Sequence, residues 1–361
     1  MQTISLSLGN RSYPIWIESG IHQRLNELLK SMNTNQKWVI ITHPTLKSLF
    51  GKIILNNLKK SGFDIDMIEI PEGEKSKCLN QINIIFSKLL SMECDRSTML
   101  IALGGGVIGD ITGFVASTFM RGISYIQLPT TLLAMVDSSI GGKTGINLDQ
   151  GKNLVGTIWQ PKVVITDPNC LSSLPKRELT SALGEIMKYG FILDKSLLKY
   201  INKNIDPLLN LDIKIVSEII SRCSKLKADL VSQDENDGNI RSILNFGHTI
   251  GHALEKYFGY NILRHGEAIS YGMVVAGKLS VKKSMLQCKE YRLLERSIKN
   301  LSLPKLPNFD PDEIWHIMKM DKKIKNKKIN FILIKEIGQT IIYNDINKND
   351  VIEALTEIKK H

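Results

Sequence analysis

The sequence predicts an α/β N-terminal domain followed by an all-α C-terminal domain. Apolar stretches of strand length alternate with amphipathic stretches of helix length from about residue 37 to about residue 172, whereas nearly every periodic segment after that is helical. The length of 361 residues agrees with two domains, because one domain has roughly 150 residues. We therefore expect one domain over 1–174 and a second over 175–361.

The expected N-terminal elements alternate between strands and helices. Residues 1–17 show strand-like alternation, and residues 37–42 (KWVIIT) have the continuous apolar character of a strand buried on both faces. Such alternation favours a parallel sheet covered by helices on both sides. The other expected elements are helices over 45–62, 77–92 and 107–119 and strands over 63–70, 98–103, 124–129 and 162–167.

The C-terminal domain is expected to begin with a helix in residues 172–190 (SSLPKRELTSALGEIMKYG). Two serines can cap this helix and Pro175 suits its first turn. The residues Leu179, Ala182, Leu183 and Ile186 form an apolar stripe at helical spacing. One β-like stretch, residues 329–334 (INFILI), interrupts the helical pattern.

The composition is that of an ordinary globular protein, with 43% hydrophobic and 23% charged residues. No apolar run approaches the ~20 residues that span a bilayer, and the opening residues lack the apolar core of a signal peptide. We therefore expect a cytoplasmic protein without a membrane partner. The five cysteines are scattered and form no CxxC pair, which predicts reduced thiols and no cysteine-ligated zinc.

The net charge of +11 raises the possibility of a polyanionic partner. The densest basic run, residues 319–330 (KMDKKIKNKKIN), has no interleaved aromatic residues and no nucleic-acid-binding motif. We therefore expect no nucleic-acid partner. A phosphorylated small molecule would also be attracted by a positive site, so charge alone does not decide between these ligands.

A glycine cluster indicates a nucleotide site. Gly104, Gly106 and Gly109 have the GxGxxG spacing between an expected strand and an expected helix, where glycines let the backbone approach a pyrophosphate at the helix N-terminus. The acidic residue usually found about twenty positions later is missing. Glu72 and Glu74, directly after another strand, are candidates to contact the ribose. The alternative is a glycine-bearing surface turn, but the context favours a Rossmann-like nucleotide-binding domain.

The segment DSSIGGKTGINLDQGKN resembles a phosphate-binding loop only in part. Lys143 follows a glycine as in the motif GxxxxGK[ST], but Asp137 stands where the first glycine is required, and its carboxylate would repel phosphate. We therefore expect no ATPase. Lys143, Lys152 and Asn153 lie in glycine-rich segments, either as contacts to an anionic ligand or as parts of solvated loops. The chain has no GxSxG motif, so a serine hydrolase is not expected.

Three histidines suggest a metal site or proton transfer. His248 and His252 are four residues apart and share one helical face, and His265 follows closely. Neutral imidazoles suit Zn²⁺, although the HExxH pattern of metalloproteases is absent. A carboxylate is expected as the third ligand. The spacing leaves Glu255, Glu267 and Glu185 as alternatives.

Seven segments together resemble the 3-dehydroquinate synthase family, in the right order and over almost the whole chain. They are PEGEKSK, GGGVIGDITGFVASTFMRGI, LPTTLLAMVDSSIGGKTGIN, GKNLVGTIWQP, LGEIMKYG, NFGHTIGHALE and HGEAISYGM. The resemblance implies a nucleotide-binding domain and a helical metal- and substrate-binding domain with the active site between them. It also implies NAD, a divalent metal such as Zn or Co, and a homodimer.

The resemblance also assigns roles to individual residues. It implies Glu185, His248 and His265 as metal ligands and His252 as a residue that supports the ligands without binding the metal or that handles protons. It implies substrate-binding or catalytic roles for Arg121, Asp137, Lys143, Asn153, Lys188, Lys227, Arg241, Asn245 and a phosphate-contacting lysine, Lys322 or Lys323. It implies NAD contacts for Glu72, Gly73, Glu74, Lys75, Ser76, Lys77, Gly106, Val107, Ile108, Gly109, Asp110, Thr130, Thr131, Lys143, Lys152, Cys170, Leu171, Ser172 and Ser173.

The implied reaction converts 3-deoxy-arabino-heptulosonate 7-phosphate into 3-dehydroquinate and phosphate. It combines transient oxidation by NAD⁺, phosphate elimination, re-reduction, ring opening and an internal aldol closure. Other sugar phosphate cyclases and, more remotely, metal-dependent polyol dehydrogenases are the rival enzymes. A dehydrogenase would accumulate NADH, whereas the expected reaction releases phosphate with no net redox change.

Overall fold

The computed structural model describes residues 1–361 except 31, 33–35, 239, 321–328 and 360–361. The chain divides into two compact units. Unit 1 contains residues 1–174 and 216–236, and unit 2 contains residues 175–215 and 237–361. The segment 216–236, most of which lies in helix α9 (Ile213–Gln233), thus packs with unit 1 although the sequence prediction placed it in the C-terminal domain.

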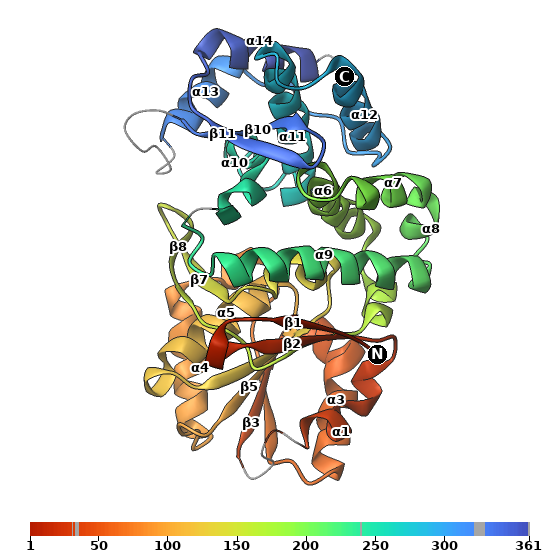
Figure 1. The fold of residues 1–361 in the computed structure, drawn as a ribbon. Coiled ribbons are helices and arrows are strands. Elements are labelled where there is room, and N and C mark those ends of the chain that lie inside the picture. The colour runs from red at the N-terminus through yellow and green to blue at the C-terminus, as the bar shows by residue number, and fades with distance from the viewer. Residues whose placement is uncertain (31, 33–35, 239, 321–328, 360–361) are drawn as a thin grey trace. The chain divides into compact units, whose positions relative to one another are not determined.

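Unit 1 contains a seven-stranded sheet with the strand order β1-β2-β9-β6-β5-β3-β4 (Figure 1). Every neighbouring pair is parallel except β1 and β2, which form an antiparallel hairpin at one edge. This arrangement confirms the predicted α/β class. The strands are β1 (Gln2–Leu6), β2 (Tyr13–Ile17), β3 (Trp38–Thr42), β4 (Ile65–Glu69), β5 (Met99–Gly104), β6 (Ser124–Pro129) and β9 (Val164–Thr166).

Helices cover both faces of this sheet because the central strands are apolar on both sides. Along β3, Val39 and Ile41 pack in one core with α4 (Leu79–Ser91) and α5 (Gly106–Thr118). Trp38 and Ile40 face the opposite core. That second core is completed by α1 (Leu25–Leu29) and α3 (Lys52–Lys60).

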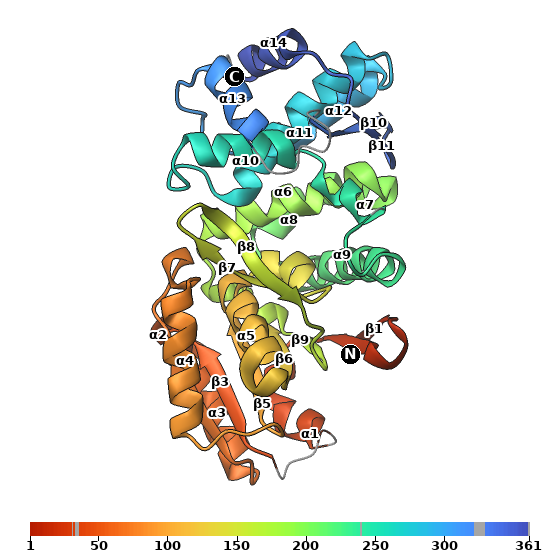
Figure 2. The ribbon, with the colours of Figure 1, turned by 90° about the vertical axis from the view of Figure 1, so that its left-hand side faces the viewer.

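Two segments of unit 1 differ from the prediction. The expected helix 45–62 is interrupted: α2 (Pro44–Leu46) is followed by a π-helical turn, Lys47–Gly51, before α3 begins. The glycine-rich segment around Lys143 and Lys152 was expected as loops but forms an antiparallel hairpin, β7 (Lys143–Leu148) and β8 (Gly151–Ile158), beside α5 (Figure 2).

Glycines allow this hairpin rather than preventing it. A Cβ on Gly156 would lie 2.1 Å from the carbonyl oxygen of Thr144, and one on Gly145 would lie 2.9 Å from that of Val155. The two strands therefore approach more closely than side chains would permit, and glycine composition was a poor guide to the backbone here.

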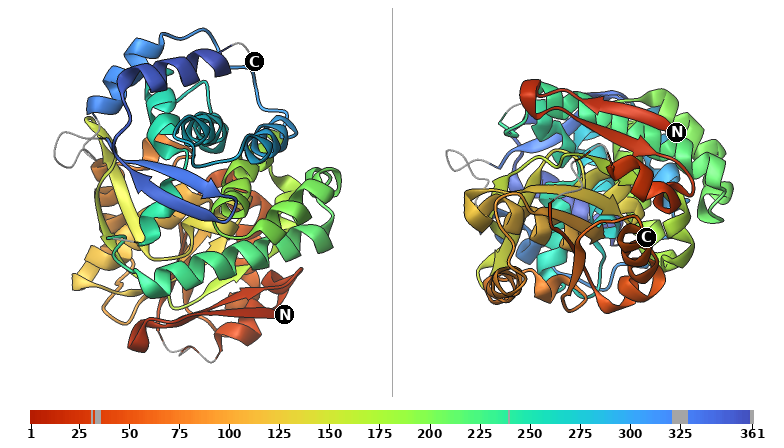
Figure 3. Two further views of the ribbon diagram at one scale, coloured as in Figure 1. Left: turned by 45° about the horizontal axis from the view of Figure 1, so that its top comes forward. Right: turned by 90° about the horizontal axis from the view of Figure 1, so that it is seen from below.

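The described part of unit 2 consists of helices and one small hairpin. The antiparallel strands β10 (Phe331–Glu336) and β11 (Gln339–Tyr343) are drawn in blue in Figure 3, and β10 includes residues 331–334 of the segment 329–334 that was expected to be β-like. Helix α11 packs against several other elements of the unit and is buried along most of its length. The helices are α6 (Lys176–Ile192), α7 (Lys195–Lys203), α8 (Ile205–Leu209), α10 (His248–Tyr257), α11 (His265–Lys282), α12 (Cys288–Lys299), α13 (Pro311–Met320) and α14 (Lys348–Ile358).

Within the described residues, no helix has both the length and the apolar character needed to cross a bilayer.

Candidate metal centre and nucleotide-binding turn

Glycines bring three helices of unit 2 into backbone contact. Between α6 and α11, a Cβ on Gly184 would lie 2.3 Å from the carbonyl oxygen of Gly266, and one on Gly266 would lie 1.8 Å from that of Ser181. Between α10 and α11, a Cβ on Gly251 would lie 3.0 Å from Cα of Ile269. No larger residue fits these contacts without moving a helix.

Each candidate metal-binding side chain is the sequence neighbour of a glycine at one of these contacts. Glu185 follows Gly184 on α6, and His265 precedes Gly266 at the start of α11. On α10, His248 follows Gly247, whose backbone is left-handed (φ +80°), and His252 follows Gly251. Close helix packing therefore carries the four side chains into one place.

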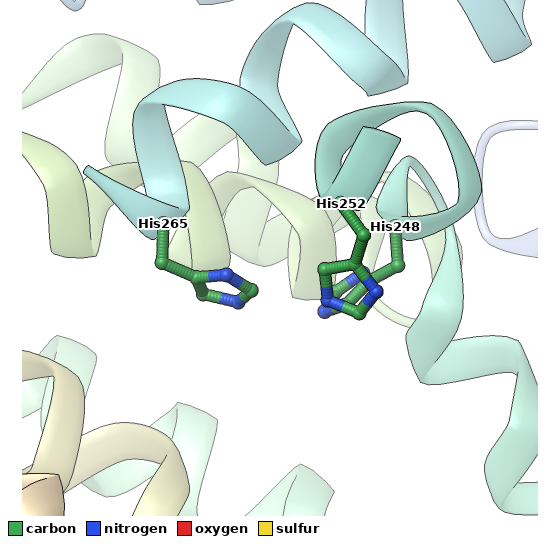
Figure 4. A group of neighbouring side chains, drawn as sticks. All are labelled: His248, His252 and His265. Carbon is green, nitrogen blue, oxygen red and sulfur yellow. The ribbon is translucent and has the colours of Figure 1, made fainter. Parts of the chain in front are cut away.

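The three imidazole rings point into a common space (Figure 4). One ring nitrogen from each of His248, His252 and His265 lies within 4.8 Å of the others. The ring centroids of His248 and His265 are 5.3 Å apart, and that of His252 is 5.2 Å from His248 and 5.7 Å from His265. The predicted clustering of these histidines is thus observed.

Glu185 supplies a carboxylate at the same place. It is only 1% exposed, and its Oε2 accepts a hydrogen bond from the ammonium group of Lys188, one turn further along α6. Its Oε1 is buried with no hydrogen-bond partner among the described residues, and it lies 3.4 Å from Nε2 of His248 and 3.4 Å from Nε2 of His265. Two ligand atoms bound at about 2.1 Å to a tetrahedral zinc lie about 3.4 Å apart, so the spacing fits such an ion.

Glu267 and Glu255, the other two carboxylates considered from the sequence, make different contacts. Glu267 is fully buried, accepts two hydrogen bonds from the guanidinium group of Arg177, and accepts another from the backbone N–H of Arg264. It thereby caps the N-terminus of α11, which begins at His265. Glu255 lies on the far side of the His265 ring, where its Oε2 is 3.1 Å from Nδ1.

His248 and His265 each have a hydrogen-bond acceptor beside Nδ1. Nδ1 of His248 is 3.2 Å from the carbonyl oxygen of Phe246, and Nδ1 of His265 faces Glu255. In each neutral ring the hydrogen then sits on Nδ1, which leaves the lone pair of Nε2 directed toward Glu185. Neither Phe246 nor Glu255 was predicted in this role. From the sequence, Glu255 had been considered only as one of the alternative carboxylate ligands.

Electrostatics prepare these groups for a cation. Burial alone would raise the pKa of Glu185, but Lys188, His248 and His265 hold that pKa well below its usual range. Burial, helped by the charge of Lys188, lowers the pKa of His248 well below its ordinary value. Burial also disfavours charge on His265, yet the carboxylates of Glu185 and Glu255, one beside each ring nitrogen, raise its pKa to about 10. The residues present therefore fit a divalent metal, which would replace the proton of His265.

The predicted nucleotide-binding turn lies between β5 and α5 of unit 1. A Cβ on Gly105 would meet the side chain of Thr131 at 2.9 Å, and one on Gly106 would meet that of Ser138 at 3.0 Å. The hydroxyl oxygens of Thr130 and Ser138 are buried without hydrogen-bond partners among the described residues. The glycines let the backbone lie close against these two side chains, and orphaned hydroxyls at a helix N-terminus fit an anionic nucleotide. Of the expected contacts, Val107, Ile108 and Gly109 lie in the first turns of α5.

Lys77 connects this helix with the β7–β8 hairpin. Lys77 is only 4% exposed, and its ammonium group donates hydrogen bonds to Asp110 on α5 and to Asn153 on β8. Asn147 adds a second connection: its side chain donates to Glu74 at 2.7 Å and accepts from the backbone N–H of Asn153 at 2.8 Å. Three predicted cofactor residues and one predicted substrate residue thus belong to one hydrogen-bond network.

Other predicted residues are distributed over both units. In unit 1, the ammonium group of Lys227 donates to Oδ1 of Asp137 at 2.6 Å and to its carbonyl oxygen at 2.7 Å. The loop with Cys170, Leu171, Ser172 and Ser173 forms a 3₁₀ turn after β9. In unit 2, Arg241 is buried in a 3₁₀ segment, Ile240–Asn245, that ends at Asn245. Arg121 is exposed, with a left-handed backbone (φ +67°). Lys322 and Lys323 lie outside the described residues.

Comparison with protein families gives two adjoining matches. The family described as 3-dehydroquinate synthase N-terminal matches residues 67–181, and the family described as 3-dehydroquinate synthase C-terminal matches residues 182–324. A curated 3-dehydroquinate synthase of Prochlorococcus marinus subsp. pastoris is 43% identical over 97% of this chain and 98% of its own. One of Thermodesulfovibrio yellowstonii is 44% identical over 99% of this chain and 100% of its own.

Solved structures share the fold. A 2-epi-5-epi-valiolone synthase from Streptomyces hygroscopicus subsp. jinggangensis, with NAD⁺ and Zn²⁺ bound, has a TM-score of 0.89 at 24% identity and covers 98% of each chain. A 2-deoxy-scyllo-inosose synthase complexed with carbaglucose-6-phosphate, NAD⁺ and Co²⁺ also has a TM-score of 0.89 at 24% identity, over 99% of this chain and 100% of that one. A glycerol dehydrogenase from Schizosaccharomyces pombe has a TM-score of 0.70 at 16% identity, over 96% of this chain and 88% of that one.

Proposed function

Because the chain belongs to the 3-dehydroquinate synthase family, we propose that it converts 3-deoxy-arabino-heptulosonate 7-phosphate into 3-dehydroquinate and phosphate. The reaction class is that of a phosphate-eliminating carbon–oxygen lyase. The observation that carries the proposal is the buried Oε1 of Glu185, which faces Nε2 of two histidines at a spacing suited to a metal. Identities of 43% and 44% to relatives named for this activity, over nearly the full chain, support it.

The metal centre is proposed to consist of Glu185, His248 and His265. When bound, NAD⁺ would accept a hydride from the ring carbon that carries a hydroxyl group, as that hydroxyl loses its proton, and would later return the hydride. A divalent metal held by these residues would polarise the hydroxyl. Lys188 holds the Glu185 carboxylate by Oε2 and leaves Oε1 toward the ion. His252 lies in the same cluster and is proposed to handle protons rather than to bind the metal.

The cofactor site is proposed at the β5–α5 turn. The N-terminal N–H groups of α5 attract the pyrophosphate. The hydroxyl groups of Thr130 and Ser138, which have no hydrogen-bond partner among the described residues, donate hydrogen bonds to the cofactor. Lys143 and Lys152 lie on the adjacent hairpin, and we propose that they bind the anionic parts of cofactor and substrate.

Asp137, Asn153, Lys227, Arg241 and Asn245 are proposed to hold the substrate. A flexible phosphorylated sugar acid requires several fixed charges and donors, because orientation lowers the entropic barrier of each step. The ion pair of Lys227 with Asp137 orders two of these groups before any ligand binds.

The test is phosphate release from the heptulosonate phosphate in the presence of NAD⁺ and Zn²⁺. We expect release of one phosphate per substrate, no accumulation of NADH, and loss of turnover when a chelator removes the metal. Glucose 6-phosphate, whose carba analogue is bound in one structural neighbour, serves as the control substrate. Turnover of that sugar alone would assign the chain to another sugar phosphate cyclase, and net NADH formation would assign it to the dehydrogenases.

A homodimer is part of the proposal, since the family resemblance implies one. Sedimentation equilibrium should give twice the chain mass of 40.6 kDa, and a mass of one chain would contradict the proposal.

A further inference from the structure

We propose that Glu255 is a positioning residue for the metal centre: its carboxylate fixes the ring and the tautomer of His265 and thereby slows the release of the metal. This inference rests on the proposed metal site. It assigns Glu255 a role different from that of a direct ligand, which remained open from the sequence.

The contact is built to be rigid. Glu255 lies on α10 and is only 6% exposed, while His265 is the first residue of α11. Oε2 of Glu255 is 3.1 Å from Nδ1 of His265, and α10 and α11 are in backbone contact at Gly251. A carboxylate held on one packed helix therefore orients an imidazole that begins the next.

The geometry separates Glu255 from the ligands. Oε1 of Glu185 faces Nε2 of His265, whereas Oε2 of Glu255 faces Nδ1 on the opposite side of the same ring. A metal bound between Glu185 and Nε2 has the imidazole between itself and Glu255. Such a carboxylate–histidine–metal arrangement fixes the tautomer and increases the electron density that the ring gives to the metal.

The two histidines proposed as ligands differ in the acceptor that lies beside Nδ1. His248 has the neutral carbonyl oxygen of Phe246 beside its Nδ1, whereas His265 has a carboxylate. The side chain of His265 is also more exposed, at 34% against 12% for His248. The stronger acceptor therefore orients the less enclosed ring, which has more freedom to turn.

The test uses Glu255→Gln and Glu255→Leu, with zinc loaded at saturation and its release followed in excess chelator. Glutamine keeps an acceptor oxygen but removes the charge, and leucine removes both. We expect release about 10-fold to 100-fold faster for Glu255→Leu, the range by which loss of such partners weakens metal sites, and an intermediate rate for Glu255→Gln. The dissociation rate is chosen because it does not include competition between zinc and protons for the free imidazole.

The matched control is Glu178→Gln. Glu178 belongs to the same unit and pairs with Arg264 at 2.9 Å, next to His265, but its side chain is 39% exposed and makes the pair at the surface. Its removal should leave zinc release unchanged. A spectroscopic readout complements the rates: ¹⁵N-histidine NMR of the zinc protein should show His265 protonated at Nδ1, with that proton shifting upfield in Glu255→Leu.

The outcomes distinguish the inference from the proposed function. Release at the wild-type rate by a folded Glu255→Leu variant, or His265 protonated at Nε2, would overturn the inference alone. If the Co²⁺ absorption spectrum of Glu255→Gln shows that the ion has lost one ligand, Glu255 binds the metal directly and the inference is overturned. Failure of the wild-type protein to bind zinc would instead refute the proposed metal site.

Discussion

At the scale of single residues, the chemistry depends on one carboxylate oxygen. Oε1 of Glu185 is buried, lacks a hydrogen bond among the described residues, and lies equally far from two imidazole nitrogens. A buried carboxylate oxygen needs a positive charge beside it, because it has lost its hydration. In the free protein that charge is the protonated ring of His265, and a bound cation would take its place.

The division of roles among the four donors is tested by Glu185→Ala and His252→Ala. We expect Glu185→Ala to lose bound zinc and turnover together. His252→Ala should keep wild-type zinc content and lose turnover by about a hundredfold, the lower end of what a positioned acid–base group contributes. Zinc measured by mass spectrometry after gel filtration decides the matter. Stoichiometric loss of zinc from His252→Ala would show that His252 is a ligand.

The pKa of His265 leads to a pH dependence. Its pKa of about 10 lies above the ordinary value of 6.5, so zinc must displace a proton from the folded protein at any pH below about 10. Zinc affinity should therefore rise with pH up to about 10, by at most about tenfold per pH unit, with release of one proton. Calorimetry in buffers of different ionisation enthalpy measures that proton. Affinity independent of pH would contradict the coupling.

The same raised pKa affects the metal-free protein in the opposite direction. Protonated His265 between two carboxylates stabilises the fold fully below its ordinary pKa, and this contribution is lost as the pH rises through about 10. The metal-free protein should consequently unfold at lower denaturant concentration as the solution becomes alkaline, while the zinc-bound protein should show a smaller change.

At the scale of elements, glycines decide where the donors lie. Gly184, Gly251 and Gly266 allow α6, α10 and α11 to touch along their backbones, and each adjoins a donor in sequence. The site is therefore as precise as the helix packing that carries it, and we expect one added methyl group at these contacts to displace a donor.

This dependence predicts a difference between two alanine substitutions on α11. In Gly266→Ala the new Cβ would lie 1.8 Å from a backbone oxygen, so we expect a loss of about 1–3 kcal/mol or more in unfolding free energy, together with weaker zinc binding. In Gly277→Ala the nearest atom is a leucine methyl group at 3.1 Å, which can move. Alanine also favours the helix there by up to about 1 kcal/mol. Urea unfolding and zinc titration compare the two, and equal behaviour would refute the argument.

At the scale of the whole molecule, the residues proposed to bind NAD and the residues proposed to bind the metal lie in different units. The nucleotide turn and the hairpin belong to unit 1, and the metal cluster belongs to unit 2. NAD⁺ and zinc should therefore each stabilise their own unit when added alone, because a ligand that binds the folded state and not the unfolded state adds stability by mass action.

Hydrogen exchange tests this separation. Zinc alone should protect amides of α6, α10 and α11, and NAD⁺ alone should protect those of β5 and α5. The gain in local opening free energy should approach about 2.7 kcal/mol at a free ligand concentration of about 100 times Kd, for amides that exchange by unfolding of the unit. Glu185→Ala serves as the control, since zinc should no longer protect its helices. Protection by zinc confined to unit 1 would contradict the assignment.

Much of the fold was predictable from local pattern. Continuous apolar runs predicted the central strands, and residues 124–129 form a strand with the expected bounds. Helical periodicity predicted α4, α5 and α6. Local pattern was misleading where glycine content suggested loops, as in the β7–β8 hairpin, because a backbone-to-backbone contact leaves no side-chain periodicity in the sequence.

The sequence by itself determined the chemical types of the donors, the clustering of His248 and His252 on one helical face, and, through its motifs, the family. Only the tertiary structure decided that Glu185 faces the histidines, that Glu267 is occupied by Arg177, and that Glu255 lies behind the ring of His265. The physical reason is range. Helical and strand periods report which side chains of one element share a face, whereas the meeting of α6 with α10 and α11 depends on how their glycine surfaces pack.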